Sequence, residues 1–380
     1  MNIKKFTPLV FLSSLGAGGI AVMPFVLMQY TIEHGEGLIT RTQLWSNNFS
    51  AGVGFYYYLL EAIMIIFSIL HFVLSVWFVI KLFKWLKIDE AKQLFNDPLR
   101  NATVVTPFIS LLMTMNLFIG PIRYFLPLLS NNFQSMFLPA MLFWSAIFIT
   151  VLWTEIKLLK ITFEKSFDID KIHFGWLLHP FLLGMLSTVG TGIAAMAKDA
   201  SIANTAAFMS MISFSMGVFL LSTKLIMLFK SHFRSPSLPE KNFLPSFLIV
   251  IPNITLFAIS AFRLGHFLEK HHGFHLNSYF YFVIGLSFAF EIWYMLFGLS
   301  LLSDYFKKNH FKEFYITQWG LICPLVAFVV LGAFAYDVVL ASPILYGLFI
   351  AVMNITIAFY FELLYKHIKC SKISDELNCK

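Results

Sequence analysis

The chain has 380 residues, of which 58% are hydrophobic and only 12% are charged, and its mean hydropathy is +0.77. A soluble protein carries about 25% charged residues, so this composition excludes an ordinary soluble enzyme. The formal net charge of +7 does not indicate nucleic-acid binding, because the basic residues lie in short loops beside apolar segments, where they orient membrane spans. We expect a single all-α membrane domain over residues 1–380, embedded in a lipid bilayer.

Ten segments are apolar over the length of about 20 residues that a helix needs to cross a bilayer. The first begins after Lys4 and Lys5, like a signal peptide. It stays apolar through Tyr30 and lacks a convincing cleavage site, so we interpret it as the first membrane span. The predicted spans are 7–30, 55–82, 104–128, 133–158, 174–197, 202–229, 244–267, 277–304, 315–339 and 343–366.

The positions of lysine and arginine test this count. With both termini in the cytoplasm, 22 of the 27 basic residues fall in cytoplasmic segments. Cytoplasmic loops of membrane proteins carry an excess of lysine and arginine, and one miscounted span would remove the asymmetry. The pattern predicts a multi-pass protein of the inner (cell) membrane. The basic residues on the outer side are Arg41, Arg123, Lys198, Arg263 and Lys270.

Proline divides the spans into two classes. A proline inside a helix removes a backbone hydrogen bond, and in a membrane only protein or water can satisfy the freed carbonyl. Links from odd to even spans are often short, so the chain predicts five helical hairpins. Their kinked first helices would form an inner ring around a central pore, inside an outer ring of straight helices, although prolines are frequent in membrane helices generally. The interiors of the odd spans contain Pro24, Pro107 with Pro121, Pro180, Pro252 and Pro324, whereas the interiors of the even spans contain only Pro139.

Four segments combine prolines or glycines with apolar runs near the start of odd spans. They are Phe6–Phe25 (FTPLVFLSSLGAGGIAVMPF), Asn96–Met113 (NDPLRNATVVTPFISLLM), Leu244–Leu256 (LPSFLIVIPNITL) and Gln318–Phe328 (QWGLICPLVAF). In order and spacing these segments resemble the tellurite-resistance/dicarboxylate transporter family, which includes the slow-type anion channels of plant guard cells. Asp97 stands where the family usually has histidine.

The resemblance implies a homotrimer of independent pores that conduct anions passively, each plugged by a phenylalanine of the ninth helix. Here Cys323 stands at the position that matches this phenylalanine. We therefore expect either a less occluded pore or its closure by another aromatic residue, such as Phe108 or Phe181. The pore-lining and gating residues that we predict are Cys323, Pro324, Phe328, Phe108, Phe181, Gly18, Gly190 and Pro252.

Arg123 and Arg263 lie near the outer ends of the third and seventh spans. We expect them to attract anions to the outer mouth of the pore. The simpler alternative is that both side chains extend to the lipid headgroups.

The glutamates within the spans all fall on even spans, which keeps these carboxylates off an anion pathway. Glu291 is the deepest of them and is the candidate proton relay if the protein is a coupled carrier. His71 and His179 lie at different depths, which disfavours a haem site. The histidines of the outer loop 265–277 lack the spacing of a metal site, so we expect no metal and no cofactor. The acids are Glu61, Glu155, Glu291 and Glu362, and the loop histidines are His266, His271, His272 and His275.

The sequence therefore predicts a passive channel for small inorganic anions such as chloride and nitrate, without enzymatic activity. A proton-coupled carrier for C4-dicarboxylates is the first alternative, but no lysine or arginine lies at mid-depth on an odd span to bind the substrate. A quinone-reactive membrane subunit of a respiratory complex is the second alternative, and the proline pattern gives it no support. The chain has no phosphate-binding G-x-x-x-x-G-K motif of a nucleotide-driven pump.

Overall fold

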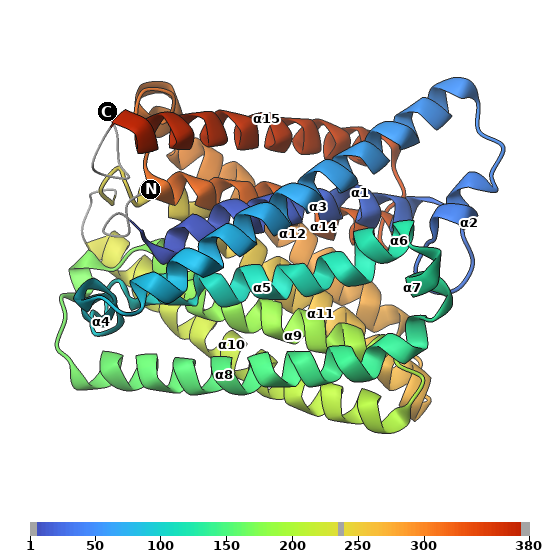
Figure 1. Cartoon of the computed structure of the whole chain (residues 1–380), viewed down its shortest axis with the longest axis horizontal. Coiled ribbons are helices and arrows are strands. Elements are labelled where there is room, and N and C mark those ends of the chain that lie inside the picture. Colours follow the sequence, from blue (N-terminus) through green and yellow to red (C-terminus); the bar gives the residue numbers. More distant parts are fainter. Residues whose placement is uncertain (1–5, 235–238, 374–380) are drawn as a thin grey trace.

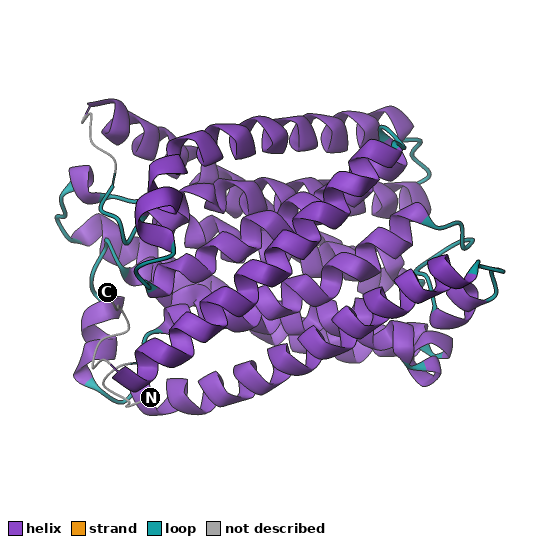
Figure 2. Ribbon diagram, turned by 90° about the horizontal axis from the view of Figure 1, so that it is seen from above, coloured by secondary structure: helices purple, strands orange, loops and turns teal. Residues whose placement is uncertain are grey.

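The computed structural model describes residues 6–234 and 239–373, which form a bundle of long, roughly parallel and antiparallel helices without β-strands (Figures 1 and 2). Ten helical segments in these residues are long and apolar enough to cross a membrane. All ten predicted spans are confirmed, with ends that differ by a few residues. The two ends of the described chain lie at the same end of the bundle, as the predicted topology requires (Figure 1).

Most odd-numbered spans begin with a short 3-10 helix that continues into an α-helix, whereas even-numbered spans are mainly single long α-helices. The odd spans comprise η2 (Pro8–Val10) and α1 (Phe11–Thr31); η3 (Asn101–Val105), α5 (Thr106–Leu117), the π-helix η4 (Phe118–Ile122) and α6 (Arg123–Phe125); η7 (Phe174–Leu177) and α9 (Leu178–Met196); η8 (Leu244–Ile249) and α11 (Val250–His272); and η10 (Ile316–Leu321) and α14 (Ile322–Val338). The even spans comprise α3 (Ala51–Trp85), η5 (Phe133–Met136) with α8 (Phe137–Glu164), α10 (Ala200–Arg234), α12 (Asn277–Leu301) and α15 (Pro343–Ile373).

Short helices occupy the connections between the spans. Because α11 continues to His272, most of the predicted outer loop 265–277 is helical, which corrects the sequence-based boundary. The connecting helices are α2 (Arg41–Trp45), α4 (Asp89–Phe95), α7 (Pro127–Asn131), η6 (Ile169–Lys171), α13 (Ser303–Tyr305) and η9 (Phe306–His310).

The odd spans form an inner ring and the even spans surround it. Between 50% and 100% of the most apolar stretch of each odd span is buried, compared with 22% to 33% for each even span. The inner helices contact one another in the cyclic order α1, α5, α9, α11, α14 and back to α1. The outer helices α3, α10, α12 and α15 pack mainly on their own hairpin partners, whereas α8 packs more on α9 than on its partner α5. The predicted inner ring is therefore confirmed.

The inner ring also closes at its predicted cytoplasmic end, where η2, η3, η7, η8 and η10 contact one another in the same cyclic order. Pro180, Pro252 and Pro324 each occupy the third residue of the α-helix that follows the 3-10 segment. The first four N–H groups of an α-helix have no partner within the helix, so these prolines remove no α-helical hydrogen bond. The sequence-based placement of Pro324 in the middle of a helix is thus wrong, because the span joins two helix types.

Candidate functional site

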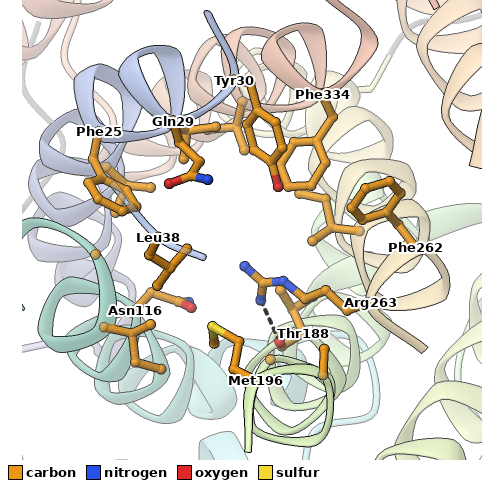
Figure 3. A pocket seen from close by; sticks show the side chains of 18 of the residues that line it. Phe25, Gln29, Tyr30, Leu38, Asn116, Thr188, Met196, Phe262, Arg263 and Phe334 are labelled. Atoms are coloured by element: carbon orange, nitrogen blue, oxygen red, sulfur yellow. Dashed lines mark hydrogen bonds between the residues drawn. The ribbon is translucent and has the colours of Figure 1, made fainter. Parts of the chain in front are cut away.

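A cavity of about 1510 Å³ lies between the five inner helices and reaches the outer loops (Figure 3). Apart from Phe133 and Gln134 at the outer start of the fourth span, the described residues of the outer ring contribute nothing to its lining. The lining of its deeper half is almost wholly apolar. It includes Gly16 and Gly19 of α1, Met113 of α5, Phe181 and Met185 of α9, Pro252 and Leu256 of α11, and Cys323, Val326 and Ala327 of α14.

Toward the predicted cytoplasmic side the cavity ends before the ring of 3-10 helices, none of whose residues lines it. Phe181 is the bulkiest side chain in the deepest part of the lining, and it is only 3% exposed. The cavity is therefore a vestibule that opens on the predicted outer side and that packed side chains close toward the predicted cytoplasmic side.

The connection after α1 folds over the outer mouth of the vestibule. Gly35 and Gly37 adopt left-handed conformations, with φ of 78° and 93°, which let the chain turn there. The Gln29 side chain donates to the Gly37 carbonyl at 3.1 Å and accepts from the Ile39 amide at 2.8 Å. The Leu38 side chain points toward the open centre (Figure 3).

Arg123 also fixes the connection that follows α1. Its guanidinium donates to the Ile39 carbonyl at 2.6 Å and to the Ile119 carbonyl at 3.0 Å. The residue is 2% exposed and does not line the cavity. Arg263, in contrast, lines the cavity and points into its centre (Figure 3). The two arginines that the sequence groups together therefore have different surroundings.

Of the eight residues that the sequence predicts as pore-lining or gating, Cys323, Phe181 and Pro252 line the cavity. Phe328 faces away from it and packs against Phe288 of α12 and Phe349 of α15, with ring centroids 5.3 and 6.4 Å apart. The other four also lie outside the lining: Pro324, Phe108, Gly18 and Gly190. Gly18 packs against Met113 and His71, and Gly190 against Trp144 and Ser210.

Gly190 allows α9 to approach both α8 and α10. A Cβ atom there would overlap the ring of Trp144 and the hydroxyl of Ser210. We expect Gly190→Ala to destabilise the protein by about 1–3 kcal/mol, the usual cost of overpacking a core. Thermal unfolding of the purified protein in detergent checks this expectation. Gly320→Ala is the matched control, because no atom lies within 4 Å of a Cβ built there. Equal melting temperatures of the two variants would contradict this packing role.

Each of the four intramembrane glutamates of the outer ring has a partner, and only the partner of Glu291, Thr255, lines the cavity. Glu61 accepts from Arg41 at 2.9 Å and also from Trp45 and Tyr124, and this carboxylate raises the pKa of Arg41. Glu155 contacts His179, Glu362 contacts His310 and Lys366, and Glu291 contacts Thr255. None of the four lines the cavity.

Sequence reasoning missed the residues that surround Arg263. Tyr30, Asn116, Thr188, Phe262 and Phe334 line the cavity around it (Figure 3). Tyr30 packs against Phe334 with ring centroids 4.1 Å apart and the rings tilted by 38°. The only feature of the sequence that pointed to these five residues was their position on odd spans. The spacing of residues within a fully buried helix does not show which face of the helix lines the pore.

A profile of the voltage-dependent anion channel family matches residues 5–368, nearly the whole chain. The chain belongs to this family. No curated protein shows significant similarity to the chain. Membership of the voltage-dependent anion channel family agrees with the inner ring and its vestibule, and it identifies the protein as a multi-pass membrane channel or transporter for anions.

Proposed function

We propose that the protein is a passive channel of the inner (cell) membrane for small monovalent anions such as chloride and nitrate. The observation that supports this most is the distribution of charge. The described residues contribute no acidic side chain to the deep lining of the cavity, while the intramembrane glutamates lie on the outer ring. Carboxylates along a narrow pore would repel anions and favour cations.

In this mechanism an anion enters the vestibule from the outer side. The mouth carries charges of both signs, so Arg263 supplies the attraction deeper inside. The anion then loses part of its hydration shell against an apolar wall and passes the constriction at Phe181. We also propose, from the family resemblance, a homotrimer in which each chain forms its own pore, without a cofactor or an enzymatic activity.

One contact favours a second candidate, a proton-coupled carrier for C4-dicarboxylates. Thr255 lines the cavity, donates to the Ile251 carbonyl at 3.1 Å and also contacts Oε1 of Glu291. A hydroxyl has one proton, so if it goes to Ile251 the contact with Glu291 requires a protonated carboxyl group as donor. The second oxygen of Glu291 is buried without a partner among the described residues. An uncharged acid one side chain away from the lumen is what proton coupling would use.

Purified protein in voltage-clamped bilayers distinguishes the two functions. A reversal potential that follows the chloride or nitrate gradient and ignores a pH gradient supports the channel. A current that requires a proton gradient overturns it in favour of the carrier.

Glu291→Gln sharpens this test, because glutamine can still donate to Thr255 but cannot release a proton. We expect this variant to leave the anion current of a channel unchanged, since an uncharged acid and an amide place no charge beside the pore. In a carrier, the same substitution would abolish proton-driven uptake. Flux of labelled succinate into proteoliposomes, with and without a pH gradient, measures that second outcome.

A further inference from the structure

Arg263 reaches from α11 into the open centre of the cavity (Figure 3). Its Nη1 atom donates to the Thr188 carbonyl at 2.7 Å, which fixes the guanidinium against α9. A guanidinium has five N–H donors. Among the described residues, no other acceptor bonds to Arg263 and no carboxylate forms an ion pair with it. The remaining donors therefore face the cavity without a protein partner.

Arg263 lies between the charged mouth of the cavity and its apolar closed end. Lysines and carboxylates are mixed at the mouth, where Lys198 and Lys270 line the cavity together with Glu269 and Asp337. From Arg263 toward the closed end, the described lining contains no further charged side chain. An anion that has entered the vestibule thus meets this guanidinium as the last full charge before the apolar constriction.

Two polar side chains from other helices face the same opening. The Tyr30 hydroxyl from α1 and the Asn116 amide from α5 point toward the centre that Arg263 occupies (Figure 3). Neither side chain makes a hydrogen bond to another described residue, so both can donate to a ligand in the cavity. Donors from three helices therefore converge on one space.

We propose that Arg263, assisted by Tyr30 and Asn116, forms a weak binding site in the pore that prefers planar oxyanions, such as nitrate or a carboxylate, over spherical halides. The proposal rests on the proposed anion transport and specifies its ligand class. Two parallel N–H groups of a guanidinium match two coplanar oxygens of one anion, whereas chloride offers no such pair. A lysine at the same place would attract both kinds of anion as a point charge.

Three variants of the purified full-length protein test the site. Arg263→Lys keeps the positive charge but removes the paired N–H groups of the guanidinium. Arg263→Gln removes the charge and the paired N–H groups. Lys198→Gln removes one exposed charge at the mouth and is the matched control. The first readout is the melting temperature in detergent during titration with sodium nitrate, formate or chloride. The second is the relative permeability of nitrate and chloride under bi-ionic conditions in bilayers.

For the wild-type protein and for Lys198→Gln we expect nitrate to bind and permeate in preference to chloride. Arg263→Lys should lower the nitrate affinity about tenfold, as loss of a strong hydrogen bond implies, and bring the permeability ratio close to one. Stabilisation by formate as well as nitrate would indicate carboxylate ligands, and stabilisation by nitrate alone would indicate a mineral oxyanion; both support the site.

An unchanged preference for nitrate in Arg263→Lys would overturn the proposal, because an arginine that only tied α11 to α9 through Thr188 would leave ion preference unaffected when replaced by lysine. Failure of the transport function gives a different result. Nitrate binding that depends on Arg263, without anion current in bilayers, would retain the site and reject the channel. Anion current without any preference would retain the channel and reject the site.

Discussion

Replacing Phe181 with alanine is expected to raise the anion conductance on the order of a hundredfold. The phenyl ring lines the deepest part of the cavity and is 3% exposed. Its removal would widen the apolar constriction at which an anion loses water, and lowering that barrier by about 3 kcal/mol corresponds to this factor. Single-channel and macroscopic currents of the purified protein in bilayers measure the change.

Phe328→Ala is the matched control for this experiment. Phe328 is also a buried phenylalanine of the inner ring, at 6% exposure, but it packs outward against Phe288 and Phe349. We expect its loss to lower stability without opening the pore. Higher conductance in Phe328→Ala together with unchanged conductance in Phe181→Ala would contradict the assignment of Phe181 as the gate.

The second large effect concerns stability and the contact between the fourth and fifth spans. His179 and Glu155 meet at 2.7 Å, and their side chains are 3% and 0% exposed. The other carboxylate oxygen of Glu155 has no partner among the described residues. His179→Ala would leave this buried carboxylate without its hydrogen-bond donor, and an unsatisfied buried polar group costs about 1–3 kcal/mol. The melting temperature of the purified protein should fall accordingly.

A surface pair provides the comparison. Lys160 and Glu164 lie 3.5 Å apart on the same helix, with side chains 70% and 60% exposed. Lys160→Ala should change the free energy of unfolding by no more than about 1 kcal/mol. The double variant Glu155→Gln/His179→Ala should recover part of the stability that His179→Ala loses, because it removes the stranded charge. If His179→Ala and Lys160→Ala had the same melting temperature, the buried pair would have no structural importance.

The outcome for Arg123 and Arg263 shows where sequence reasoning reached its limit. Both arginines were predicted at the outer mouth from their depth alone, yet one fixes the connection at Ile39 and the other enters the lumen. Depth follows from position within an apolar segment. The direction of a side chain depends on helix rotation, which neighbouring helices set through packing.

For the same reason, the sequence could not distinguish residues that line the cavity from residues that face away from it. Phe181 and Cys323 line the cavity, whereas Gly190 and Phe328 do not. In a soluble helix, polar and apolar faces reveal its orientation. Every residue in the most apolar stretch of α9 is buried, so no such contrast exists there. Buried glycines of α9 are equally suited to a pore wall and to a tight helix crossing.

The sequence by itself determined the membrane class, the ten spans and the membership of the inner ring. These follow from local properties, because hydropathy, basic residues and prolines act within a single segment. Only the tertiary structure decided which side chains meet at the centre. It joined Arg263 with Tyr30 and Asn116 from three distant spans and placed Phe181 at the closed end, because such contacts arise only when the five helices pack in a ring.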